Sequence, residues 1–295
     1  MPGTLARRWM RIDHSPGCAS PTSSDASLRG GSVSTGDDAL MRLTHIGGPT
    51  VLVELAGWRI LTDPTFDLPG RRYGFGWGTS SVKTEGPAVD PADLGGIDVV
   101  LLSHDHHADN LDDAGRKLLT RAGEVVTTVP GAGRLGRARG LQNWASTTLT
   151  RDGLPPLTVM ATPCRHGPPL SRPITGKVIG FAVSVEGSTR TDLWMTGDTV
   201  VYPELIGAAE RLDVDVALVH LGGVRFPLTG PVRFTMTASG AVDVISALRP
   251  RVAVPVHCEG WSHFREPEVE ARRVLDASAV RDTVRWLTRG VSEEV

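Results

Sequence analysis

The most constraining feature of this sequence is a buried-strand pattern that gives way at once to a cluster of histidines and aspartates. Residues 97–102 are apolar apart from Asp98 and rich in β-branched side chains, which is typical of a strand inside a sheet. The next ten residues, SHDHHADNLD at 103–112, contain three histidines and three aspartates. A helix pattern begins at about residue 114. Because open α/β folds place their ligand chemistry on loops at the carboxyl ends of strands, we predict a functional site here.

The spacing within this cluster favours a metal ion. His104 and His106 are two residues apart, so on an extended backbone both imidazoles project to the same side. Asp109 adds a carboxylate oxygen. Imidazole combined with carboxylate suits zinc, iron or manganese better than calcium or magnesium. A solvated polar loop is the alternative interpretation, and the density of histidine and aspartate directly after a core strand argues against it.

Three further apolar runs end in the same kind of residue. Residues 157–162 lead to His166, residues 192–196 to Asp198, and residues 252–256 to His257. Strand ends on one edge of a sheet converge in space, so we expect these side chains to meet the cluster at 103–112. The predicted metal ligands are therefore His104, His106, Asp109, His166, Asp198 and His257.

The remaining patterns indicate an α/β fold. Short strands are predicted across residues 43–62, and strands then alternate with helices to the end of the chain, which is typical of this class. Residues 65–96 are rich in glycine and proline and are predicted to be a long loop, with Tyr73, Phe75 and Trp77 as packing anchors. The two interpretations of this loop are a cover over the site and a simple ordered surface loop. The segment 167–177 is expected to help shape the pocket. Residues 1–40 show no periodicity and are rich in serine and glycine, so we predict a disordered tail.

Composition excludes several other classes of protein. The 295 residues carry a net charge of −2, so no global basic field favours nucleic acid or an anionic membrane as a partner. No run approaches the roughly 20 apolar residues of a transmembrane helix, and no apolar segment follows the first arginines as a secretory signal requires. The three cysteines show no pairing pattern, which favours a reducing compartment. We predict a cytoplasmic protein with a small-molecule substrate, and the sequence leaves its oligomeric state open.

Taken together, these motifs resemble the metallo-β-lactamase superfamily. The resemblance covers residues 41–290, and it is closest to the branch of L-ascorbate-6-phosphate lactonase and N-acyl-phosphatidylethanolamine phospholipase D. It implies a four-layer αββα sandwich, with a hydrolase domain over residues 41–295. The segments that carry it are 43–47 with Thr50, 60–64, the cluster at 103–112, 196–198, and 255–257 with Trp261 and Phe264.

The resemblance also implies how the ligands are shared between two metal ions. His104, His106 and His166 would hold the first ion, Asp198 would bridge, and Asp109 and His257 would hold the second. The sequence departs from the family motif in two ways. One extra residue separates His106 from Asp109, and Asn110 stands where a third loop histidine is expected. The alternatives are a weak or absent second ion, or a second site in which His107 replaces the missing imidazole.

The implied activity is metal-dependent hydrolysis, with one or two zinc ions, or manganese or iron in their place. The ion would activate water to attack a phosphodiester, a lactone, or another ester or amide of a small molecule. Asp109 is the predicted proton acceptor. His263 is a candidate proton donor or oxyanion partner, although a packing role is equally consistent with the sequence. Two other functions stay open. The first is a metal-binding sensor or chaperone-like protein without turnover, and the second is a nuclease, which the near-neutral charge argues against.

Overall fold

The computed structural model describes residues 40–295, and the predicted tail over residues 1–40 lies outside them apart from residue 40. Two large sheets and a small one form within this range. In order across the first sheet, the strands are β15 (Ser292–Glu294), β1 (Arg42–Gly47), β2 (Thr50–Leu55), β3 (Trp58–Thr62), β6 (Val99–Leu101), β7 (Glu124–Thr128) and β8 (Arg139–Leu141). Across the second sheet they are β14 (Val252–Val256), β13 (Val214–His220), β12 (Thr191–Met195), β11 (Gly180–Val185), β10 (Leu157–Thr162) and β9 (Ser146–Leu149).

The two large sheets pack face to face over a continuous apolar core. Successive side chains of a strand point to opposite faces, and the clusters follow this alternation. In β6, Val99 and Leu101 enter the core between the sheets, whereas Val100 packs on the outer face. In β13, Val216 faces the inner core and Ala217 faces the outer one. A strand buried on both faces has to be apolar throughout, which explains the unbroken runs in the sequence.

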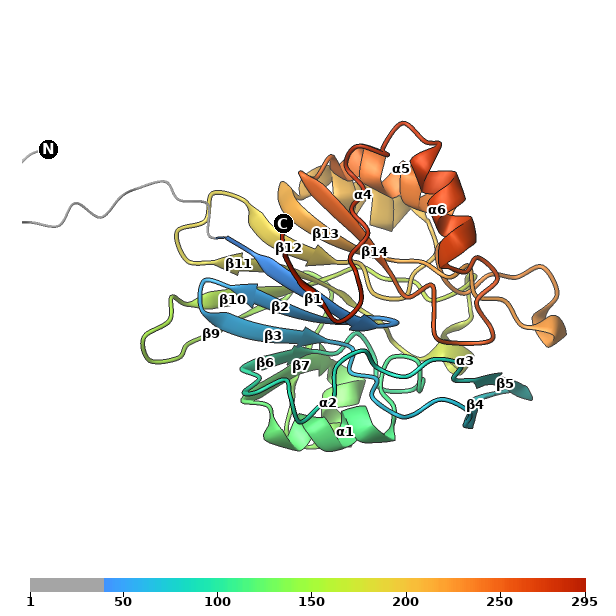
Figure 1. Ribbon diagram of the computed structural model, residues 1–295, viewed down its shortest axis with the longest axis horizontal. Helices are drawn as coiled ribbons and strands as arrows, with labels where there is room; N and C mark the ends of the chain where they lie inside the picture. The colour runs from blue at the N-terminus through green and yellow to red at the C-terminus, as the bar shows by residue number, and fades with distance from the viewer. Residues whose placement is uncertain (1–39) are drawn as a thin grey trace, which may run out of the picture. The chain divides into compact units, whose positions relative to one another are not determined.

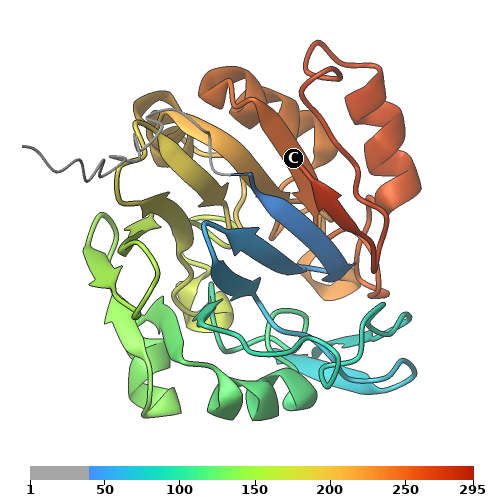
Figure 2. The same ribbon diagram turned by 60° about the vertical axis from the view of Figure 1, so that its left-hand side comes forward.

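Helices cover the outer face of each sheet (Figure 1). On the first sheet they are α1 (Asp113–Leu118) and α2 (Val129–Leu135), with the short 3-10 helix η1 (Leu119–Arg121). On the second they are α4 (Pro203–Arg211), α5 (Ala238–Leu248) and α6 (Glu268–Asp276). Figure 2 shows the same arrangement from another side. The four layers confirm the predicted αββα sandwich.

Strand direction brings the predicted site residues to one edge of the sandwich. β3 and β6 are parallel in the first sheet, and β12, β13 and β14 are parallel in the second. β10 runs in the direction of β12, because both are antiparallel to β11. The loops that carry the histidines and aspartates therefore leave their strands on the same side.

The segment predicted as a long loop contains a hairpin instead. β4 (Arg72–Gly76) and β5 (Thr79–Val82) pair as a separate two-stranded sheet, which projects beyond the two large sheets (Figure 1). The sequence prediction missed these strands because glycines interrupt their alternating pattern. Tyr73 and Phe75 are buried, as expected of packing anchors, but Trp77 at the tip is 72% exposed.

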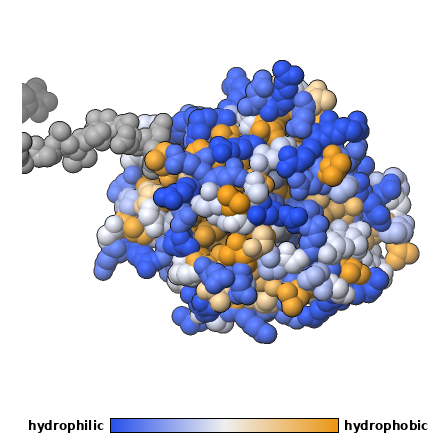
Figure 3. Space-filling model, in the orientation of Figure 1, coloured by the Kyte–Doolittle hydropathy of each residue, from blue (hydrophilic) through white to orange (hydrophobic). Residues whose placement is uncertain are grey.

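Two short helices complete the described elements, α3 (Arg172–Thr175) and the 3-10 helix η2 (Pro227–Thr229). No helix within residues 40–295 is long and apolar enough to cross a membrane. On the face drawn in Figure 3, apolar residues are scattered among polar ones.

Candidate metal centre

Two groups of potential metal ligands lie at the edge where the strands end. One consists of His104, His107 and His166, and the other of Asp109, Asp198 and His257. Within each group the ligand atoms all lie within 4.8 Å of one another. All six side chains are buried. Each group draws residues from the loop after β6 in the first sheet and from loops of the second sheet.

The imidazoles of the first group converge with the spacing of metal ligands. His107 Nδ1 lies 3.2 Å from His104 Nε2 and also 3.2 Å from His166 Nε2. Two nitrogens bound tetrahedrally to zinc are about 3.3 Å apart. The three nitrogens therefore already stand close to the positions that one ion requires.

Outer hydrogen bonds orient two of these rings. His166 Nδ1 donates to the backbone oxygen of Phe234 at 2.7 Å. Ser103 Oγ donates to Asp63 Oδ2 at 2.7 Å and accepts from His104 Nδ1 at 2.9 Å. With Nδ1 protonated in both histidines, each Nε2 presents its lone pair to the cluster, as is usual for ligands of a metal.

The electrostatics keep the first group neutral. Burial and the neighbouring histidines hold the pKa of His104 well below its ordinary value. Burial likewise lowers the pKa of His107 to about 4 and that of His166 to about 3. Metal binding requires unprotonated imidazole, so these three side chains are ready to bind at neutral pH.

The second group contains buried polar atoms that no protein group satisfies. Asp109 Oδ1, Asp198 Oδ2 and His257 Nε2 all lack a hydrogen-bond partner. Burial, reinforced by Asp109, raises the pKa of Asp198 to about 7 against the opposing effect of His257. Unsatisfied buried polar atoms are rare and costly, and a cation held between these side chains would satisfy all three. The donor set thus fits a metal ion.

The structure places His106, a ligand in the sequence prediction, outside both ligand groups. The backbone bends at Asp105 and His106, and Arg134 holds the Asp105 carboxylate with two hydrogen bonds of 2.5 and 2.6 Å. This bend accommodates the extra residue of the loop. It directs His106 outward, with 29% of its side chain exposed, and it turns His107 inward beside His104. His107 thus joins the first group, and not the second as the sequence alternative supposed.

Asn110 takes a structural position beside the second group. Its Nδ2 donates to Asp63 Oδ2 at 3.0 Å and to Asp198 Oδ1 at 3.4 Å. Its Oδ1 has no partner. The asparagine therefore links the two buried carboxylates where a histidine ligand was expected.

The geometry places His263 in the site. His263 Nε2 lies 3.0 Å from Asp109 Oδ2, and its Nδ1 lies 2.5 Å from Ser81 Oγ. The side chain is buried. The hairpin that supplies Ser81 thus helps to hold the histidine against Asp109.

Comparison with known proteins agrees with the fold. A family model described as "Beta-lactamase superfamily domain" matches residues 58–258. The chain belongs to the metallo-β-lactamase superfamily.

Its relatives in the superfamily span most of its length. A protein of Carboxydothermus hydrogenoformans named "UPF0173 metal-dependent hydrolase" is 30% identical over 227 residues, which are 75% of this chain and 86% of the relative. Among solved structures, the isothiocyanate hydrolase from Delia radicum gut bacteria is 21% identical, with a TM-score of 0.72 over 86% of this chain and 98% of that one. A possible metal-dependent hydrolase from Veillonella parvula is 17% identical, with a TM-score of 0.74 over 87% and 100%. The two structures show a shared fold.

Asp63 supports the ligand loop of this superfamily member, a role that the sequence reasoning did not assign. It directly follows β3, with a left-handed φ of +27°, and is fully buried. Its carboxylate accepts from the backbone N–H of Ser103 at 2.6 Å, from Ser103 Oγ and from Asn110. The available signal was an aspartate at the end of an apolar strand, the same pattern that identified Asp198.

Glu259 supports the loop that carries His257. His257 has a left-handed φ of +61°, and its N–H donates to the Gly48 oxygen at 2.9 Å. Glu259 accepts from the Gly48 N–H at 2.6 Å and lies 3.3 Å from His45 Nε2. Burial opposes ionisation of Glu259, but His45 and the Gly48 N–H outweigh it and lower the pKa to about 2.

Replacing Glu259 with alanine is expected to lower the free energy of unfolding by about 1–3 kcal/mol, because the Gly48 N–H and His45 lose their buried acceptor. Urea unfolding of EDTA-treated protein measures this without a contribution from metal. Glu268→Ala is the control, since the Glu268 pair with Arg272 is partly exposed and such pairs contribute at most about 1 kcal/mol. Equal free energies of unfolding for the Glu259→Ala and Glu268→Ala variants would contradict the supporting role of Glu259.

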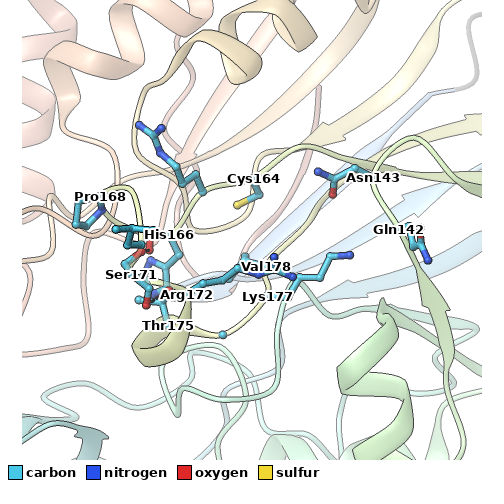
Figure 4. A pocket seen from close by; sticks show the side chains of 13 residues that line it. Gln142, Asn143, Cys164, His166, Pro168, Ser171, Arg172, Thr175, Lys177 and Val178 are labelled. Atoms are coloured by element: carbon cyan, nitrogen blue, oxygen red, sulfur yellow. Dashed lines mark hydrogen bonds between the residues drawn. The ribbon is translucent and has the colours of Figure 1, made fainter.

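A cavity of about 420 Å³ reaches His166. Arg165, Arg172 and Lys177 line it without any acidic residue, and none of the three forms an ion pair within the described part of the chain. Figure 4 shows Arg172 close to His166, with Lys177 extending toward Gln142. We call this cavity the basic groove. It confirms that the segment 167–177 lines a pocket, as expected.

Proposed function

We propose that this protein is a metal-dependent hydrolase that cleaves an ester, lactone, amide or phosphodiester bond of a small molecule. The observation that carries the proposal is the pair of ligand groups, one neutral and convergent, the other with buried atoms left unsatisfied. Zinc is the proposed ion, with manganese or iron as alternatives. Membership of the superfamily and the names of the relatives support this reaction class. The branch of L-ascorbate-6-phosphate lactonase and N-acyl-phosphatidylethanolamine phospholipase D is part of the proposal.

The chemistry divides between the ion and the protein side chains. A bound divalent ion lowers the pKa of a water molecule from about 16 to about 7 and so supplies a nucleophile at neutral pH. The Asp109 carboxylate, which belongs to the second ligand group, is also the proposed proton acceptor. His263 donates from Nε2 to Oδ2 of Asp109, while its Nδ1 accepts from Ser81. His263 therefore presents an N–H at the site and is the proposed hydrogen-bond partner of the developing oxyanion, while the proton that Asp109 takes from the water passes to the leaving group.

The first test is elemental analysis of the full chain, purified without added metal, beside the Asn110→His variant. We expect two ions per chain in both proteins, because Asp109, Asp198 and His257 complete a second group without Asn110. Hydrolysis is then assayed on a panel of esters, lactones and phosphodiesters. EDTA is expected to abolish turnover, and added zinc, manganese or iron to restore it.

Each other outcome has a defined meaning. One ion per chain in the natural protein and two in the Asn110→His variant would show that the natural site binds a single metal ion. Bound metal without turnover on the whole panel would favour the metal-binding sensor or chaperone-like alternative, which the departure at Asn110 motivates. Absence of metal from both proteins, or turnover that survives EDTA, would contradict the proposal.

A further inference from the structure

A small cavity opens directly onto the two ligand groups. His107, Asp109, His166 and His263 form its polar side. Apolar side chains supply most of the rest, from the β4–β5 hairpin, from α3 and from the segment that includes η2. They include Phe75, Trp77, Val224, Phe226 and Phe234. We call this cavity the aromatic pocket. A group attached to the bond under attack can lie beside these walls.

The rings of the pocket pack against the site histidines. Phe226 lies nearly parallel to His263, at an interplanar angle of 14° and a centroid separation of 5.5 Å. Phe75 lies 5.2 Å from His107 and 5.1 Å from His263. Phe75 and Phe226 are also 7% and 8% exposed, so the wall is mostly withdrawn from water. The immediate surroundings of the reacting bond are therefore apolar.

The charges around the pocket distinguish it from the basic groove. The lining of the aromatic pocket contains no lysine or arginine, and Asp109 is its one acidic side chain. An anionic substituent placed here would have no cationic side chain as partner and would pay the full cost of leaving water. An uncharged apolar substituent meets aromatic surface instead.

The pocket is also small in this conformation. Its volume is about 30 Å³, which is enough for one or two water molecules. Trp77 at the rim is largely exposed, and the turn at Gly78 lies against Leu228 in η2. Any substituent larger than a few atoms therefore requires these two segments to separate.

We propose that the substrate carries an uncharged, apolar group next to the bond that is cleaved, and that this group binds in the aromatic pocket. The inference rests on the proposed hydrolase function and narrows its substrate class.

The activity test compares two esters with the same leaving group, 4-nitrophenyl butyrate and mono-4-nitrophenyl succinate. They are similar in length and differ in a terminal carboxylate. With the zinc-loaded full chain, we expect kcat/KM for the butyrate to exceed that for the succinate at least 10-fold, the lower end of the discrimination that an apolar pocket gives. Both esters are corrected for hydrolysis without enzyme.

A binding test separates the pocket from the reaction. Saturation-transfer NMR on the zinc-loaded protein compares benzyl alcohol with 4-(hydroxymethyl)benzenesulfonate, which has the same ring and a remote charge. We expect a signal from the alcohol and at least 10-fold weaker binding of the sulfonate. Absence of turnover with this binding pattern would contradict the hydrolase function and still support the pocket.

The variant Thr229→Arg introduces a cation at the pocket, and Thr120→Arg is its matched control. Thr120 lies within η1 and Thr229 within η2. The hydroxyl of each donates to the backbone oxygen three residues earlier. Thr229 lines the pocket, and Thr120 is exposed. Thr229→Arg is expected to weaken binding of benzyl alcohol and to lower the butyrate preference at least 5-fold, whereas Thr120→Arg changes neither.

Three results would overturn the inference. The first is binding of the sulfonate that equals or exceeds binding of benzyl alcohol. If the Lys177→Ala variant then failed to bind the sulfonate, the basic groove would be the site that recognises it. The second is binding of neither probe. The third is a Thr229→Arg protein that behaves like Thr120→Arg.

Discussion

Replacing His107 with alanine is expected to lower zinc affinity by more than about 100-fold, whereas the neighbouring His106→Ala variant is expected to stay within about 10-fold of the natural protein. His107 Nδ1 stands 3.2 Å from the ligand nitrogens of both His104 and His166. Loss of a residue that only supports a ligand already costs 10- to 100-fold in affinity, so loss of a ligand should cost more. His106 points outward, and its Nδ1 lies 3.6 Å from Asp105 Oδ1.

Zinc affinity is measured by calorimetric titration of the EDTA-stripped protein with zinc. Circular dichroism shows that both variants fold. The two substitutions are chemically identical and adjacent in the chain, so each controls for the other. Loss of zinc binding in His106→Ala with retention in His107→Ala would show that His106 is the ligand, as the sequence motif first suggested.

Replacing Asp112 with alanine is expected to destabilise the fold by about 3–5 kcal/mol, the usual cost of removing one partner of a buried ion pair. Asp112 Oδ2 lies 2.8 Å from Lys83 Nζ, and both side chains are almost inaccessible to water. The same carboxylate caps α1 by accepting from the Gly115 N–H and also accepts from the Asp67 N–H. One substitution therefore leaves a buried ammonium and two backbone donors without their acceptor.

The Lys83→Met variant separates these contributions. It is expected to cost less than Asp112→Ala, because Asp112 keeps its two backbone donors. In the double variant the uncompensated charge is gone, so its loss of stability should be smaller than the sum of the two single losses. Urea unfolding of the four EDTA-treated proteins measures this difference. Additive losses would show that the ion pair does not couple the two residues.

The strand and helix patterns of the sequence were sufficient to predict an α/β fold, and the resemblance to the superfamily added its four layers. Continuous apolar strands can only be buried on both faces, and the polar residues at their ends have to gather at one edge. The expected convergence agrees with the structure, in which His104 and His166 share one ligand group and Asp198 and His257 share the other. It required only strand positions and directions, which periodicity reveals.

The exchange of His107 for His106 could not be predicted in the same way. It depends on where a loop with one extra residue bends, and that is decided by contacts from distant segments, such as Arg134 with Asp105. The aromatic pocket was equally hidden, because Phe75 is far in the chain from Phe226 and Phe234. The prediction of a covering loop identified Phe75 as an anchor, but gave no sign that its ring would face the histidines.

The origin of the ligands in both sheets has a mechanical consequence. In each ligand group, at least one side chain comes from the loop after β6 and at least one from the opposite sheet. An ion bound there acts as a cross-link that fastens the two halves of the sandwich at their open edge. Because an ion that binds only the folded chain stabilises it by mass action, the supply of metal sets how firmly the two sheets stay closed around the site.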